Sequence, residues 1–76
     1  MKREILVEDG IGGEHMIKYI DKERVAVQKV MRNDSDDLIY YSLLSRVPLR
    51  ELDSWPYTES LKTQISEFHA QFPDAK

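Results

Sequence analysis

All three glycines of the chain fall within four positions, Gly10 to Gly13. Glycine adopts the positive-φ backbone conformations that other residues avoid, so this cluster indicates a tight reversal of the chain. The segment before it, Arg3 to Glu8, places Ile5 and Val7 on one face of a strand. The segment after it, His15 to Ile20, does the same with alternate apolar side chains. The pattern predicts two strands joined by a hairpin loop.

A third strand is expected over Arg24 to Arg32, after the polar break at residues 21–23. Val25, Val27 and Met31 would share one face of it. A helix is the alternative for this segment, because Val27 and Met31 are also four residues apart. The high content of β-branched residues and the polar turn that follows favour the strand.

The run Asn33 to Asp37 is typical of a turn, because its short polar side chains hydrogen-bond to nearby backbone groups. The next segment, Leu38 to Val47, reads as a fourth strand that pairs with the third as a hairpin. Its alternate apolar residues would face the core, and these are Ile39, Tyr41, Leu43 and Val47. Pro48 ends it, because proline has no N–H to donate to a neighbouring strand.

The C-terminal segment carries a helical pattern. Its apolar residues recur at intervals of four, three and four, and they are Leu61, Ile65, Phe68 and Phe72. Ser54 is expected to cap the helix, with Pro56 and Glu59 in its first turn and Pro73 at its end. We therefore expect a single α+β domain over residues 1–76. It would be a small antiparallel sheet of three or four strands with one C-terminal helix packed on one face.

Small size and the absence of cysteine limit how this domain can be stabilised. A domain of 76 residues buries only about 60% of its unfolded surface, and without cysteine no disulfide can add stability. Small domains of this kind often gain stability by oligomerising. The longest apolar run is four residues, Leu38 to Tyr41, which is too short for a membrane span or a signal peptide. We expect a cytoplasmic protein that makes no membrane contact.

The charge balance argues against a dedicated nucleic-acid-binding protein, because 14 acidic and 11 basic residues leave a net charge of -3. One basic stretch nevertheless defines an alternative function, a small nucleic-acid-associated regulator. Its residues are Lys18, Tyr19, Lys22, Arg24, Lys29 and Arg32, in which Tyr19 would stack on a base. Acidic residues interrupt this stretch, so a solvated strand edge is the simpler interpretation.

Catalytic, cofactor and metal sites are not expected. The glycine cluster lacks the spacing of a dinucleotide-binding loop, and Asp9 and Glu14 beside it would repel phosphate. Neither histidine, His15 or His69, has a second ligand at a metal-binding spacing. No serine lies in a nucleophile-elbow pattern. We therefore expect a protein that is not an enzyme and that binds neither a metal nor a cofactor.

Surplus apolar surface is the main functional indication. If one helix covers the face that bears Ile39, then Leu38, Tyr40 and Leu44 point away from it. With Arg46 and Trp55 they have the composition of a protein contact surface. Two alternatives are that the connection from Arg46 to Trp55 covers this face, and that Trp55 covers the core. We expect a small protein-binding module, such as an inhibitor or adaptor, whose partner is another protein or a second copy.

Overall fold

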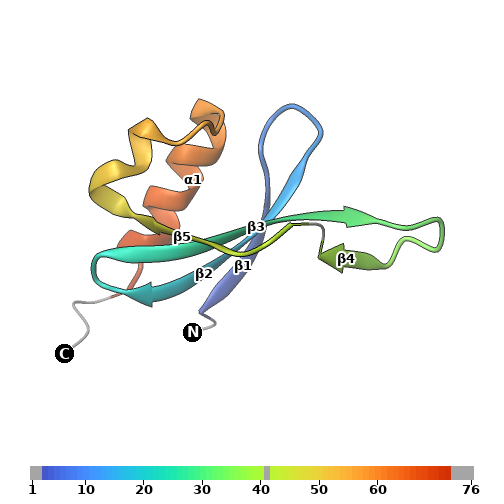
Figure 1. Ribbon diagram of the computed structural model, residues 1–76, viewed down its shortest axis with the longest axis horizontal. Helices are drawn as coiled ribbons and strands as arrows, with labels where there is room; N and C mark the ends of the chain where they lie inside the picture. Colours follow the sequence, from blue (N-terminus) through green and yellow to red (C-terminus); the bar gives the residue numbers. More distant parts are fainter. Residues whose placement is uncertain (1–2, 41, 73–76) are drawn as a thin grey trace.

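The computed structural model describes residues 3–40 and 42–72, which form an antiparallel sheet with helical segments on one face (Figure 1). The strands are β1 (Glu4–Glu8), β2 (Glu14–Asp21), β3 (Arg24–Arg32), β4 (Leu38–Tyr40) and β5 (Ser45–Pro48). They are followed by the 3₁₀ helix η1 (Leu49–Ser54) and the α-helix α1 (Glu59–Ala70). The expected α+β class is confirmed. The sheet has five strands, one more than expected, because the fourth segment is divided.

The loop predicted at the glycine cluster and the break predicted at residues 21–23 are both confirmed. Gly10 and Gly12 have φ angles of 90° and 92°, in the region that favours glycine. Asp9 fixes this loop, because its Oδ1 accepts hydrogen bonds from the backbone N–H groups of Ile11 and Gly13, both at 2.9 Å. Residues 24–32 form a strand and not a helix, with Val27 directly opposite Ile17 on β2.

The core lies between the sheet and α1, on what we call the helix-side face. Helix α1 contributes Leu61, Ile65 and Phe68, which confirms the predicted stripe, and Phe72 packs partly against the same cluster. The buried residues that the rest of the chain contributes to this cluster are Val7, Ile17, Tyr19, Val25, Val27, Val47 and Leu52. This cluster lies at one end of the sheet, so α1 does not bury the side chains at the other end.

The predicted start of the helix is wrong. Ser54 is the last residue of η1, and Thr58 caps α1 by accepting a hydrogen bond from the Leu61 N–H at 3.1 Å. The cause is Pro56, since a residue that precedes proline avoids the helical conformation, and Trp55 is extended with φ -82° and ψ 147°. Glu59 lies in the first turn as predicted. The helix ends at Ala70, and Pro73 lies outside the described residues.

The predicted single strand from Leu38 to Val47 is also wrong. Both β4 and β5 pair with the same edge of β3, and residues 42–44 between them leave the ladder. Ser42 holds this break, because its hydroxyl accepts from the Lys29 N–H at 3.1 Å and its carbonyl accepts from the Gln28 side chain at 2.7 Å. Leu43 is therefore exposed and not in the core. Tyr41 lies outside the described residues.

The connection from Arg46 to Trp55 does not cover the second face of the sheet. Val47 and Leu52 are buried in the core, and Leu49 packs against it, so this segment lies on the helix-side face. In Figure 1 both η1 and α1 lie above the sheet. We call the opposite side the open face.

Candidate interaction surface

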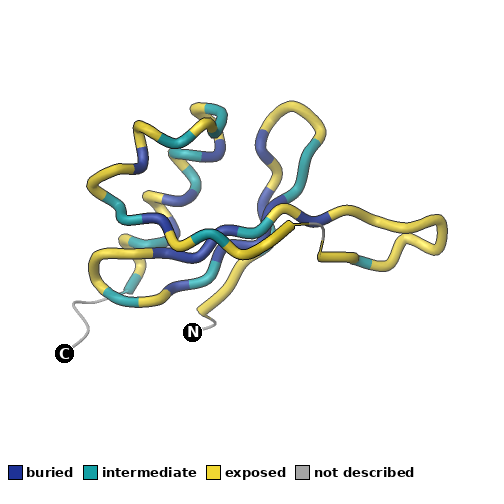
Figure 2. The backbone as a smooth tube through the Cα atoms, in the orientation of Figure 1, coloured by how far each residue is buried: buried dark blue, intermediate teal, exposed yellow. Residues whose placement is uncertain are grey.

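A two-stranded arm extends from one end of the sheet. The pairing of β2 with β3 ends at Glu14 and Val30, so Met31 and Arg32 pair with β4 alone. We call residues 31–40 the arm, and Figure 1 shows it pointing away from both helices. Figure 2 shows that most of this segment is exposed, in contrast to the root of the arm at Val30, which is buried. The molecule is consequently elongated, at 41 × 26 × 19 Å.

Local hydrogen bonds give the tip of the arm a defined shape. The side-chain oxygen of Asn33 accepts from the backbone N–H groups of Ser35 and Asp37, both at 2.9 Å. Asp36 adopts a φ of 65°, which short polar residues tolerate best after glycine. Arg32 holds the turn to the sheet by donating to the Asp36 carbonyl at 3.0 Å and to Glu14 Oε1 at 3.1 Å. The arm is therefore a hairpin whose turn is closed by side-chain hydrogen bonds.

Apolar side chains are exposed on both faces of the arm. By their pairing, Met31 and Ile39 lie on the helix-side face, and each is 47% exposed. On the open face Tyr40 is 53% exposed, and Leu44 follows at 41%. Helix α1 does not pack on β4, so Ile39, which we predicted to be a core residue, is exposed. An isolated two-stranded hairpin is marginal in water, and a patch of this kind on a small domain indicates a contact surface.

The structure places three of the five predicted partner-binding residues on the open face and a fourth in the loop beside it. Tyr40 pairs with Val30, Leu38 with Arg32, and Arg46 with Ala26, which places all three on the open face. Leu44 lies in the loop between β4 and β5. Trp55 is separate from this set, because it packs against the helix-side core and stacks with Tyr57 at 5.9 Å between ring centroids. The alternative interpretation of Trp55, a residue that covers the core, is confirmed.

The basic stretch does not form one surface. Tyr19 is buried, with its ring stacked on Phe72 at 4.4 Å, so it cannot stack on a base. Three of the cations have acidic partners: Lys18 lies 3.8 Å from Glu4, Arg24 2.6 Å from Asp21, and Arg32 3.1 Å from Glu14. Lys22 is in the turn between β2 and β3, and Lys29 projects on the helix-side face. The charge is thus divided between two faces and largely neutralised.

A buried polar pair lies where the first loop meets α1, and the sequence analysis missed it. His15 is opposite Lys29 on β3, and its Nδ1 lies 3.8 Å from Asp9 Oδ2, too far for a hydrogen bond. The ring packs edge-on to Tyr57 at 6.1 Å between centroids. Asp9 also reaches the helix, because its carbonyl accepts a hydrogen bond from the Thr58 hydroxyl at 2.6 Å. The sequence features that could have indicated this pair are an aspartate directly before the glycine cluster and a histidine at the start of the next strand.

Burial determines the charge of His15, and hydrogen bonds determine the charge of Asp9. Burial lowers the pKa of His15 below the ordinary value of about 6.5, because desolvation disfavours the charged ring more than the Asp9 carboxylate stabilises it. The ammonium group of Lys29 lowers the pKa of His15 further. The backbone N–H groups of the loop hold the pKa of Asp9 below its usual value, with a smaller contribution from His15. His15 is therefore neutral and Asp9 ionised at neutral pH.

We expect stability to fall as the pH drops below about 6.5, because the unfolded chain then binds a proton at His15 that the folded chain excludes. His15→Gln should remove this part of the decline. The measurement is the urea midpoint between pH 7.5 and 5. His69→Gln is the control and should keep the decline, since His69 makes its hydrogen bond elsewhere, by donating its Nε2–H to the Asp21 backbone carbonyl at 2.8 Å. An unchanged pH profile in His15→Gln would contradict the expectation.

Two hollows flank Lys29 on the helix-side face. One, of about 320 Å³, lies between His15, Ser42 and Tyr57, and the other, of about 530 Å³, lies between the first loop and Met31. The Ser42 hydroxyl in the smaller hollow is engaged with backbone groups of Lys29 and Leu43. Within residues 3–40 and 42–72, no three metal-ligating side chains are placed to hold an ion.

Comparison with known proteins provides no relative. No family model, no curated protein and no solved structure matches the chain. In the part of the chain that the structure describes, no helix has the length and apolar character needed to cross a membrane.

Proposed function

We propose that this chain is a small non-enzymatic protein-binding module that contacts another protein chain through the arm, as an inhibitor or adaptor would. One observation carries the proposal: a well-formed hairpin presents apolar side chains to solvent on both faces, beyond the reach of α1. Small domains usually bury such residues or use them for binding.

The anatomy of the surface supports the same interpretation. Tyr40 supplies a large amphipathic side chain at the root of the arm, and aromatic residues of this kind are enriched at interface centres. Leu38 and Leu44 are near it in the sequence, and Arg46 and the exposed acidic residues of the turn lie farther away on its two sides. An apolar centre with a polar rim is the usual organisation of a protein contact surface.

The test compares what wild type and a double variant, Tyr40→Ala with Leu44→Ser, retain from a lysate of the source cell. We expect wild type to retain a protein in stoichiometric amount and the double variant to lose it. The thermal midpoint should change by only a few degrees, because both side chains are exposed. Ser66→Asp, on the exposed side of α1, is the matched control and should retain the protein.

Salt dependence separates this function from nucleic-acid binding. An apolar contact should persist when the salt concentration is raised from about 50 to about 500 mM, whereas binding to phosphates would weaken by orders of magnitude. Equal retention by wild type and the double variant would contradict the proposal.

A further inference from the structure

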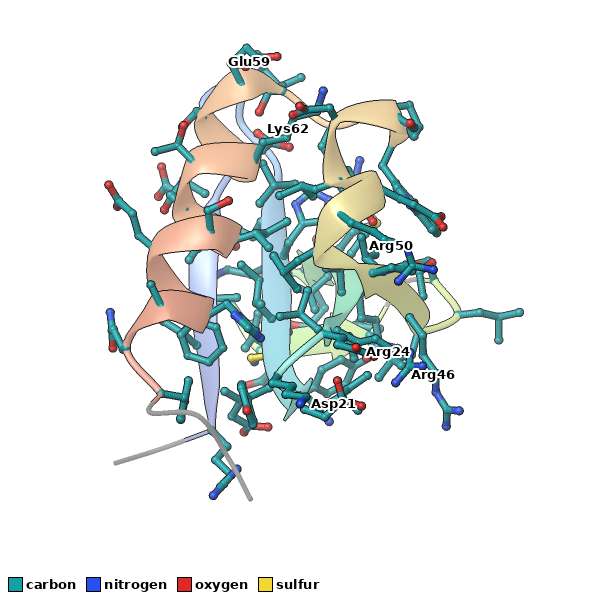
Figure 3. The ribbon with its side chains drawn as sticks, turned by 90° about the vertical axis from the view of Figure 1, so that its left-hand side faces the viewer. Asp21, Arg24, Arg46, Arg50, Glu59 and Lys62 are labelled. Carbon is teal, nitrogen blue, oxygen red and sulfur yellow. The ribbon has the colours of Figure 1, made fainter. Side chains whose placement is uncertain are left out.

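Exposed charges lie on both sides of Tyr40 along the strands. Asp34 and Asp37 are exposed in the turn at the tip of the arm, and Asp36 beside them lies within ion-pair distance of the Arg32 guanidinium. In the other direction, beyond the root of the arm, Arg46 projects from β5 to the side away from both helices, as Figure 3 shows. Within residues 3–40 and 42–72, no carboxylate lies within ion-pair distance of Arg46. The tip of the arm is therefore acidic, and the open face on the other side of Tyr40 carries a basic residue.

These charges lie in opposite directions from Tyr40. Tyr40 lies opposite Val30 on β3, and Arg46 lies opposite Ala26, four residues before Val30. At about 3.3 Å per residue, Arg46 is on the order of 13 Å from the Val30–Tyr40 row. In the other direction β3 ends at Arg32, two residues after Val30, and the acidic turn begins directly beyond it.

We propose that the partner of the arm is a second copy of this chain, with the open faces of two arms packed together and running in opposite directions. This inference rests on the proposed function. A two-fold axis across the strands at the Val30–Tyr40 row would place the two Tyr40 rings against each other. It would also bring the acidic tip of each copy to Arg46 of the other.

The remaining residues of the open face fit this arrangement. Val30 and Met16 form a buried apolar floor behind Tyr40, and Leu38 and Leu44 lie beside it. Glu14 of one copy approaches Glu14 of the other at the axis, but each carboxylate already holds Arg32 of its own chain at 3.1 Å. No uncompensated like charges therefore meet at the axis.

The test reverses the charge at each end of the contact and measures the dissociation constant of the full chain by sedimentation equilibrium. Wild type should associate to a dimer. Arg46→Glu alone, and Asp34→Lys combined with Asp37→Lys, should each raise the dissociation constant at least tenfold. An equimolar mixture of the two variants should form heterodimers with nearly wild-type affinity, because both contacts in that pair then join opposite charges. Arg50→Glu makes the same charge change on η1, on the helix-side face, and should dimerise like wild type.

The outcomes distinguish this inference from the proposed function. A wild type that stays monomeric at millimolar concentration, or a mixture that fails to restore the dimer, overturns the two-fold arrangement. If wild type is monomeric and Tyr40→Ala with Leu44→Ser still loses a retained protein, only the second-copy inference fails. If wild type is monomeric and the double variant retains the same proteins as wild type, both fail.

Discussion

Replacing Ile65 with aspartate should leave most of the protein unfolded at room temperature. Ile65 is fully buried at the centre of the stripe that α1 packs on the sheet. A carboxylate there would lose its hydration without a partner, at a cost of several kcal/mol. The stability of a domain of this size is about 5 kcal/mol, so a penalty of that order is decisive. Circular dichroism with urea titration measures the effect.

The neighbouring residue provides the control for this prediction. Ser66 is exposed on the outer side of α1, so Ser66→Asp introduces the same charge one position along without entering the core. Its free energy of unfolding should stay within about 0.5 kcal/mol of wild type. Equal losses in the two variants would show that α1 does not pack on the sheet through this stripe.

The second large effect is expected from Ile17→Ala, which should lower the free energy of unfolding by about 2–4 kcal/mol. Ile17 has no exposed surface and lies opposite both Ile5 and Val27 at the centre of the sheet. Truncation there leaves a cavity that the surrounding strands cannot fill. Chemical denaturation at a fixed pH gives the value directly.

Ile39→Ala is the control for Ile17→Ala, because Ile39 lies on the same face of the same sheet. It is 47% exposed because it lies on the arm, beyond α1. Ile39→Ala should change the free energy of unfolding by less than about 0.5 kcal/mol. If both alanine variants were equally destabilised, the arm would have to fold back onto the domain in solution.

Local patterns were sufficient to predict most of the fold. The glycine cluster and the turn at Asn33 are reversals that short-range chemistry determines, and the intervals between Leu61, Ile65 and Phe68 define one helical face. Two boundaries were mispredicted because they depend on the competition of neighbouring signals. Ser54 is a good capping residue, but Pro56 keeps Trp55 extended, so the cap moves to Thr58.

The division between β4 and β5 shows where alternation fails as a guide. Ile39, Leu43 and Val47 have the spacing of one face of a strand, but the Ser42 hydroxyl takes the Lys29 N–H and interrupts the ladder between them. Only Val47 lies under the helical layer and is buried. Alternation indicates which side a residue faces, whereas the extent of the covering helix decides whether that side is buried.

Of the candidate site, Leu38 and Tyr40 were assigned to the open face because adjacent strand residues point to opposite faces, a property of the backbone alone. Trp55 was grouped with them by composition, although its position on the helix-side face depends on the path of η1. The pairing of Asp9 with His15 was missed because it requires the register of β1 against β2, which places His15 opposite Val7.

The contacts of Asp9 connect the first loop of the chain to its last helix. Its carboxylate holds the N–H groups of Ile11 and Gly13, its carbonyl holds the Thr58 hydroxyl, and that hydroxyl holds the Leu61 N–H. These amides, up to 50 residues apart in sequence, should exchange their hydrogens with solvent in one cooperative opening. The hairpin loop and the start of α1 would then open as a single unit, while the tip of the arm, held by the separate hydrogen bonds of Asn33 and Arg32, opens independently.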